Sequence, residues 1–292
     1  MIFLFIRYLF RGGHFIRDTV LSYLILCHSF PLTIWQNYSY LCGRKRAQMY
    51  YRTLNEDEYR DLEDRILYED NHLLVVNKRA GEIVQGDRTG DECLAETLKA
   101  FVAQRDGKPG QVFMGIPHRL DRPVSGIVVF AKTSKALERM TALFREGSVH
   151  KTYWALCCSA PAVPEAELED WLVRNEKLNK TFIAKAGAKN RDAKPARLRY
   201  RYLCHTERYH LLDVELLTGR HHQLRCQLAG MGCVIKGDLK YGAPRSNPDG
   251  GISLHSRHIQ FIHPVKGTEV DITAPLPSSW PDLPNTVCAY TR

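Results

Sequence analysis

Residues 117–131 read PHRLDRPVSGIVVFA, a polar loop that leads directly into an uninterrupted apolar run. The segment 127–131 has the length and β-branched content of a buried strand, and the prolines and glycine before it constrain the loop. Catalytic side chains concentrate on loops that a rigid scaffold holds in place. The charged residues here are Arg119, Asp121 and Arg122. From spacing alone they fit a solvated turn or a structural ion pair at least as well as a catalytic site.

Helices and strands are interspersed around this loop. In the first half we expect helices over 54–63, from a Thr89 or Asp91 cap to Ala103, and from a Ser134 cap to Gly147, and strands over 66–70, 73–78, 127–131 and 151–157. In the second half we expect strands over 197–203, 210–217, 253–262 and 268–273 and one helix near 221–231. Because no regular βαβ repeat is present, this order predicts an α+β fold with a mixed, largely antiparallel β-sheet core flanked by helices.

A second segment, VHKTYW at 149–154, presents a cation and an aromatic ring together. Lys151 and Tyr153 are two residues apart, so in a strand their side chains share one face. A half-exposed strand with Tyr153 packed against its neighbours is the commoner situation.

A third segment, LTGRHHQLR at 217–225, favours a tight strand-to-helix turn. Arg220 lies at or near the expected helix start, from which it could reach a carboxylate in a neighbouring loop. Adjacent His221 and His222 cannot both face one metal from a helix, so we expect no zinc site. The nine cysteines include no Cys-x-x-Cys pair, which favours reduced, mostly buried thiols.

The net charge of +9 is unevenly distributed. Residues 1–48 are apolar and basic, and the remaining chain carries only a mild basic surplus. One patch stands out, because ten Lys or Arg residues and two acids lie between Arg174 and Arg201. Such a stripe could follow RNA phosphates, although a solvated surface hairpin explains it equally well.

The first 48 residues differ sharply from the rest, and three interpretations compete for them. Residues 19–43 contain no charged side chain and are long enough to span a bilayer, but polar residues and a proline interrupt them. A helical or disordered extension is the second interpretation. The third, which we favour, is that they precede the biological start and are not part of the mature protein, whose domain then covers 49–292. We expect a cytoplasmic protein without membrane association.

Taken together, the three segments resemble the RluA family of pseudouridine synthases. The resemblance rests on HRLDRPVSG, HKTYWALC and TGRHHQLRCQLAGMGCVIKGDLKYG, with ILYEDNHLLVVNKRAGE before them and LHSRHIQFIHPVKG after them. It covers roughly residues 65–277 and implies the pseudouridine synthase fold. Arg79 departs from the family, which usually has proline there. We expect no S4 RNA-binding domain, because residues 1–48 do not resemble one.

The resemblance also implies a reaction and a set of roles. The chain would isomerise specific uridines of rRNA or tRNA after base flipping, without a cofactor or metal. Asp121 would act as the ionised catalytic carboxylate near C1′ and C2′ of the ribose, Arg220 would form a salt bridge with it, and Tyr153 would stack on the flipped base. The expected substrate-binding and RNA-binding residues are His118, Arg119, Arg122, Lys151 and Leu224. An RNA stem-loop is the expected partner and a monomer the expected state.

Two other functions must be weighed. One uses the same fold without catalysis, and the other also cleaves a glycosidic bond. A catalytically silent RNA-binding protein would not need Asp121, Tyr153 and Arg220 together. A glycoside hydrolase normally uses paired carboxylates, and no second acid accompanies Asp121 in the three segments. Both are less consistent with the sequence than the isomerase.

Overall fold

The computed structural model describes residues 51–87, 89–108, 110–184 and 192–284, and in this part of the chain ten strands form one sheet. The strands are β1 (Ile66–Glu69), β2 (Leu73–Lys78), β3 (Ser125–Ala131), β4 (His150–Cys157), β5 (Glu165–Asn175), β6 (Lys180–Ile183), β7 (Lys194–His205), β8 (His210–Leu216), β9 (Leu254–Ile262) and β10 (Glu269–Thr273). Their order is β1-β2-β3-β9-β4-β8-β7-β5-β6, and β10 pairs with β9. Between these strands only β3 and β9 pair in parallel. The predicted α+β class with a mixed, largely antiparallel sheet is confirmed.

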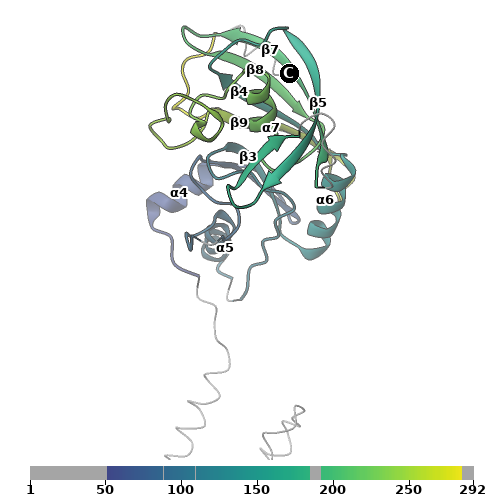
Figure 1. Ribbon diagram of the computed structural model, residues 1–292. Coiled ribbons are helices and arrows are strands. Elements are labelled where there is room, and N and C mark those ends of the chain that lie inside the picture. The colour runs from purple at the N-terminus through teal and green to yellow at the C-terminus, as the bar shows by residue number, and fades with distance from the viewer. Residues whose placement is uncertain (1–50, 88, 109, 185–191, 285–292) are drawn as a thin grey trace, which may run out of the picture. The chain divides into compact units, whose positions relative to one another are not determined.

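The described helices are α4 (Glu56–Asp64), α5 (Leu94–Arg105), α6 (Ser134–Glu146), α7 (Gln223–Gly230) and the 3₁₀ turn η1 (Leu239–Tyr241). Figure 1 shows α4 and α5 at the β1–β3 end of the sheet and α7 among the later strands. Three expected caps or starts were wrong. Cys93 precedes α5, the Thr133 side chain caps α6, and α7 begins two residues later than predicted. Strands β5 and β6 were missed.

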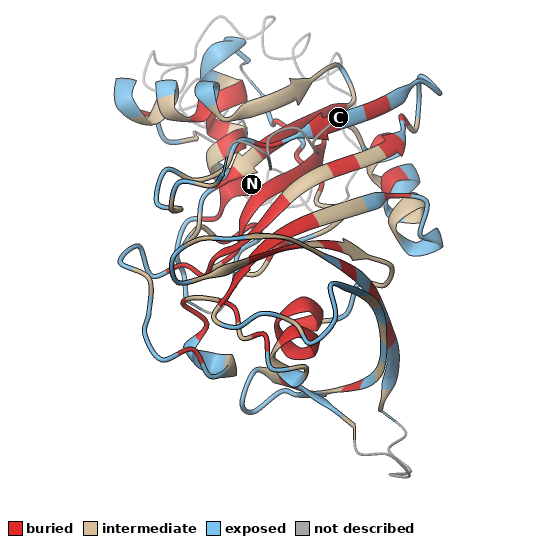
Figure 2. Cartoon of the chain, turned by 90° about the horizontal axis from the view of Figure 1, so that it is seen from above, coloured by how far each residue is buried: buried red, intermediate tan, exposed pale blue. Residues whose placement is uncertain are grey.

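Apolar side chains cover both faces of the central strands. Leu74 and Val76 of β2 pack with Phe101 of α5 on one face, whereas Leu73 and Val75 pack with Met140 of α6 on the other. Because successive strand residues point to opposite faces, both must be apolar when both faces are covered. Figure 2 shows these strands buried over much of their length. The apolar run at 127–131 is continuous for the same reason, because both faces of β3 are covered.

Helix α7 is buried on nearly all sides, and Figure 2 shows such a short buried helix within the curve of the strands. Its apolar Leu224 and Leu228 join the main core. Two of its polar side chains bond to strands, since Gln223 Nε2 donates to Arg197 O at 3.0 Å and Gln227 Nε2 to Asp170 Oδ2 at 2.8 Å. These bonds fix α7 against β5 and β7 and thereby fix the direction of every side chain on it.

The start of β3 approaches β9 so closely that only glycine fits at position 126. Gly126 has φ +110°, and a Cβ there would lie 2.5 Å from Ser256 N and closer still to Ser256 O. The neighbouring Ser125 Oγ and His255 Nδ1 are 2.9 Å apart. This contact holds the 117–124 loop, which leads into β3, beside strands β9 and β4.

We expect Gly126→Ala to lower the free energy of unfolding by more than about 3 kcal/mol, because backbone must separate from backbone. Gly267→Ala is the matched control, since Gly267 has φ +71° but no atom within 4 Å of the place that a Cβ would take. It should lose only about 1–2 kcal/mol through its left-handed conformation. Urea unfolding measures both, and equal losses would mean that the close approach of β3 and β9 contributes nothing.

The predicted N-terminal extension, residues 1–48, lies outside the described residues. Among the helices of the described part, none has the length and apolar content that crossing a bilayer requires. The cytoplasmic location and the monomeric state stay predictions.

Candidate active site

Asp121 lies in the loop before β3, and its side chain is 29% exposed. The loop is closed by a turn in which Val124 N donates to Asp121 O at 3.0 Å. Its carboxylate Oδ2 accepts from Arg225 Nη1 at 3.1 Å. Among the described residues no side chain binds Oδ1. One oxygen of Asp121 is therefore anchored by Arg225, and the other has no side-chain partner among the described residues.

The buried Lys78, at the end of β2, holds this loop in place. Its Nζ donates to the carbonyl oxygens of Arg79 (2.8 Å), Arg122 (3.1 Å) and Val124 (2.6 Å). Burial lowers the pKa of Lys78 to about 8, against the opposing charges of Glu82 and Asp121. Sequence reasoning missed this residue. The available signal was a lysine at the end of a strand whose first four residues are all apolar.

Arg225 of α7 connects Asp121 to a second, fully buried carboxylate. Its Nε and Nη2 donate to the two oxygens of Asp238 at 2.7 and 2.8 Å, while Nη1 donates to Asp121. Burial alone would lower the pKa of Arg225, but the hydrogen bonds and charges of Asp238 and Asp121 outweigh it and raise this pKa. The planar guanidinium suits such a double role, which a lysine could not fill.

The predicted salt bridge between Asp121 and Arg220 is wrong. Arg220 is exposed, and its Nε donates to Pro195 O at 3.0 Å. His222 precedes α7 with φ +50°, and this left-handed residue delays the start of the helix. The loop therefore carries Arg220 away from Asp121, and Arg225, on the first turn of α7, takes its place. Sequence spacing could not reveal the left-handed residue.

His222 is a neutral ring within this cluster. Burial, and then the charge of Arg225, lowers its pKa to about 2. Its Nε2 lies 3.1 Å from Arg225 Nη1 and 3.4 Å from Asp121 Oδ2, and its Nδ1 lies 3.1 Å from Tyr241 Oη. Because the ring is uncharged, its closeness to Asp121 is no ion pair.

Tyr153 of β4 lies beside Asp121 on the core side of the sheet. Burial raises the pKa of Tyr153 to about 12; a hydrogen bond with Ser256 opposes this rise, and the charge of Asp121 adds to it. Leu224 of α7 belongs to the same apolar cluster, and both residues are 6% exposed. Asp121 thus lies near enough to Tyr153 for its charge to act on the phenol, and the roles of Tyr153 and Leu224 stay predictions.

The other predicted site residues are spread around the loop. Arg119 is exposed, and Arg122 forms an ion pair with Asp91 at 2.7 Å. The ring of His118 accepts from Val129 N at 2.9 Å and stacks on Phe144, while burial lowers its pKa to about 3.

Lys151 lies over the ring of Phe144, with Nζ 5.6 Å from the ring centroid, and not beside Asp121. Burial lowers the pKa of Lys151. These contacts give Arg122, His118 and Lys151 partners within the protein, and their part in RNA binding stays a prediction.

Residues 185–191 of the basic patch 174–201 lie outside the described residues, and ion pairs partly neutralise the described part. Arg197 and Arg199 of β7 pair with Glu167 of β5, and Arg199 also pairs with Glu215 of β8 at 2.9 Å. Arg201 lies 3.6 Å from Asp213. Such a cross-strand ladder on a sheet surface is a structural feature. Among the described cations of this patch, Arg174 acts on the pKa of His221, and Lys180 Nζ lies 4.8 Å from the centroid of the Tyr241 ring, so both lie near the Asp121 cluster.

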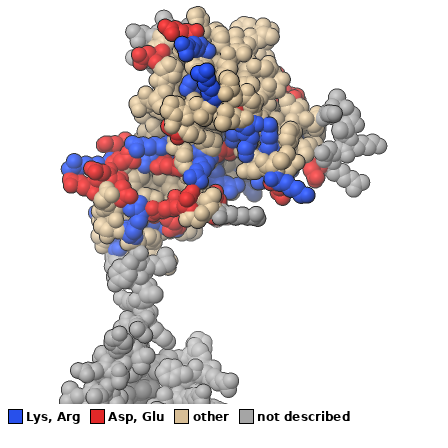
Figure 3. Space-filling view, turned by 60° about the vertical axis from the view of Figure 1, so that its left-hand side comes forward, with Lys and Arg blue, Asp and Glu red and all other residues tan. Residues whose placement is uncertain are grey.

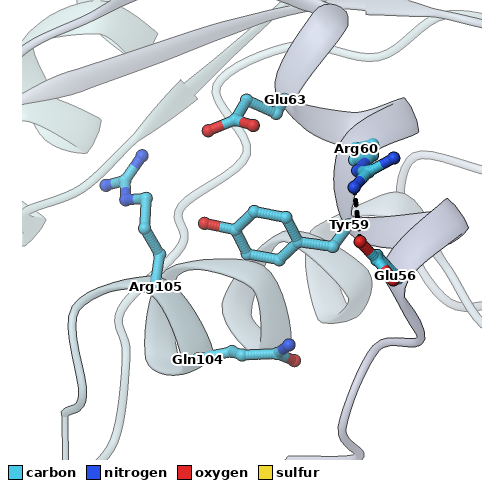
Figure 4. A pocket seen from close by; sticks show the side chains of 6 residues that line it. All are labelled: Glu56, Tyr59, Arg60, Glu63, Gln104 and Arg105. Atoms are coloured by element: carbon cyan, nitrogen blue, oxygen red, sulfur yellow. Dashed lines mark hydrogen bonds and ion pairs between the residues drawn. The ribbon is translucent and has the colours of Figure 1, made fainter.

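Two other features of the described residues carry no site. None of the described His, Cys, Asp and Glu side chains form a group of three or more that could hold a metal ion. A hollow of about 510 Å³ lies between α4 and α5, and Figure 4 shows the ring of Tyr59 between the two helices. It is open to solvent and shares no residue with the Asp121 cluster. The predicted absence of a metal and a cofactor stays a prediction.

Comparison with known proteins identifies the family and agrees with the fold. Residues 72–230, which include Asp121, Tyr153 and Arg225, match the family described as RNA pseudouridylate synthase. The chain belongs to this family of RNA-modifying isomerases. It is 35% identical over 222 residues to ribosomal large subunit pseudouridine synthase C of Vibrio cholerae, covering 74% of this chain and 67% of the relative.

Two further similarities agree with this assignment. The chain is 32% identical to ribosomal large subunit pseudouridine synthase D of Zymomonas mobilis, over 76% of this chain and 72% of the relative. Among solved structures, human RNA Pseudouridylate Synthase Domain Containing 4 superposes with a TM-score of 0.63 at 26% identity, over 75% of this chain and 91% of that one. The resemblance to the RluA family drawn from the motifs is confirmed.

Proposed function

We propose that this pseudouridine synthase isomerises uridine in ribosomal RNA and that Asp121 is its catalytic carboxylate. The observation that carries the proposal is the anchoring of Asp121, whose Oδ2 accepts from Arg225 while the side chain remains 29% exposed. The substrate class is supported by the names of the two bacterial relatives, which act on the large ribosomal subunit. Transfer RNA, the other predicted substrate, is an outcome of the test below.

The reaction breaks the bond between N1 of uracil and C1′ of ribose, turns the base and joins C5 to C1′. The proton on C5 is lost to solvent. Asp121 would serve this reaction as an anion, either by adding to C1′ or by removing a proton from C2′. In both cases the charge must persist in a site from which RNA excludes water, and the guanidinium of Arg225, 3.1 Å from Oδ2, would balance it.

The uracil must leave its stack to reach Asp121, which costs about a few kcal/mol. We place it between Tyr153, on whose pKa the charge of Asp121 acts, and Leu224, which belongs to the same apolar cluster as Tyr153. Stacking on an aromatic ring contributes about 1–3 kcal/mol of favourable binding energy per base. The hydrogen bond of Tyr153 with Ser256 would keep the ring in a fixed position while the base turns.

Basic side chains around the loop would hold the RNA backbone. Arg119 is exposed beside Asp121, and Arg174 and Lys240 both act on the pKa of neighbouring His221. Figure 3 shows basic atoms across the middle of one face of the molecule, whereas basic and acidic atoms are intermixed at its lower left. Such contacts position RNA without reading its sequence.

The test is tritium release from RNA labelled at uracil C5, prepared from cells that lack the gene and separated into ribosomal and transfer RNA. We expect release from the large-subunit ribosomal RNA fraction, with the release stopping at a stoichiometric plateau. Release from transfer RNA alone would replace the proposed substrate. Binding of RNA without release from any fraction would favour the silent RNA-binding alternative.

A further inference from the structure

The hydrogen bonds around His222 favour one arrangement of protons. Tyr241 Oη donates to Thr181 O at 3.1 Å and accepts from Thr181 N at 2.9 Å. Its one proton is thereby used, so it can meet His222 Nδ1, 3.1 Å away, only as an acceptor. A neutral ring that carries its proton on Nδ1 has a lone pair on Nε2.

That lone pair faces Arg225. The two hydrogens of Nη1 are directed to Asp121 Oδ2 and His222 Nε2, each at 3.1 Å, and Nε and Nη2 are occupied by Asp238. The opposite tautomer would place an N–H of His222 against an N–H of Arg225. The guanidinium would then have to turn, and its bond to Asp121 would be lost first because Asp238 holds two others.

The position of His222 is itself costly. It is one of two described non-glycine residues with positive φ, at +50°, and 7% of it is exposed. The ring also stacks on His221, with centroids 3.8 Å apart. A strained backbone that persists beside a reactive carboxylate is a reason to ask what it contributes.

We propose that Tyr241 fixes the tautomer of His222, and that His222 in turn orients Arg225 towards Asp121. His222 and Tyr241 are positioning residues, since they act on Asp121 only through Arg225. The inference rests on the proposed function of Asp121. It adds a requirement that the carboxylate and arginine alone do not show: the residue at 222 must offer a hydrogen-bond acceptor to Arg225 and must not offer a donor.

Two substitutions at position 222 separate this requirement from folding. Neither glutamine nor leucine is branched at Cβ, so His222→Gln and His222→Leu carry a similar cost in the left-handed conformation. Only glutamine can place an oxygen near the position of Nε2. With enzyme in excess over labelled RNA, we expect His222→Leu to slow release tenfold to a hundredfold, as loss of orienting partners commonly does. His222→Gln should stay within about threefold of the wild type, and RNA affinity should be unchanged in both.

Nitrogen-15 spectra of histidine-labelled protein provide a readout that does not depend on turnover. The signal of His222, assigned by its loss in His222→Gln, should show the tautomer protonated on Nδ1. Tyr241→Phe keeps the ring beneath Arg225 but removes the acceptor, so this tautomer should lose its predominance and release should slow about tenfold. It also serves as the test if the substitutions at 222 fail to fold.

The outcomes separate this inference from the proposed function. Equal slowing by glutamine and leucine, no slowing by leucine, or a wild-type His222 protonated on Nε2 would each overturn the tautomer lock. If the wild type releases no tritium at all, the proposed function fails. The spectra then decide alone: an Nδ1 proton that depends on Tyr241 supports the lock, and its absence overturns it.

Discussion

Asp121→Asn is expected to lower the rate of pseudouridine formation by about 10⁴-fold or more, with RNA affinity retained. Asparagine keeps the shape of the side chain and can still accept from Arg225 Nη1. It lacks the negative charge that either addition to C1′ or proton removal from C2′ needs, and removal of a central reacting group has effects of this order. Tritium release at saturating enzyme measures the rate, and filter binding measures the affinity.

A second carboxylate near the same loop gives the matched control. Asp91 pairs with Arg122, one residue after Asp121, but does not contact the Arg225 cluster. Asp91→Asn should leave the rate within about threefold, since an exposed ion pair contributes little. A comparable loss in both variants would indicate damage to the loop. If Asp121→Asn retained more than about one hundredth of the wild-type rate, another residue would have to carry the reaction.

Most of the central fold was predictable because a strand that is buried on both faces appears in the sequence as a continuous apolar run. The apolar runs of β2 and β3 can be satisfied only inside a sheet that helices cover on both sides. The β5–β6 hairpin was missed, although residues 165–172 alternate with period two. That signal was obscured because its outward positions are occupied by Glu167 and by Trp171, which is 56% exposed. An exposed tryptophan resembles a core residue in a sequence.

The sequence predicted which segments carry the candidate site better than it predicted the contacts between their side chains. Asp121 and Tyr153 lie near each other, and Leu224 belongs to the same apolar cluster as Tyr153; each lies on a segment that is easy to recognise in the sequence, and their roles stay predictions. The arginine was misassigned because two arginines five residues apart flank a turn whose form depends on one left-handed residue. Arg225 also required Asp238, thirteen residues further on. Ion pairs between residues that are far apart in the sequence depend on tertiary structure and produce no periodic pattern in the sequence.

The two arginines can be distinguished by the same conservative change at each position. Arg225→Lys is expected to slow isomerisation about 10²–10³-fold, as the loss of a buried charge-orienting donor does. Lysine keeps the charge but cannot bind Asp238 through two nitrogens and Asp121 through a third. Because Asp238 is 1% exposed, its broken pairing should also lower the free energy of unfolding by about 3 kcal/mol or more.

Arg220→Lys keeps the same charge at an exposed position whose Nε contacts only Pro195 O. Its free energy of unfolding should change by less than about 0.5 kcal/mol and its rate by less than about threefold. Because lysine preserves a phosphate contact as a point charge, a role of Arg220 in holding RNA would also survive this change. If instead Arg220→Lys showed the larger loss in rate while remaining fully stable, RNA would have to rearrange the 218–222 loop so that Arg220 reaches Asp121. The pairing with Arg225 would then belong to the free enzyme alone.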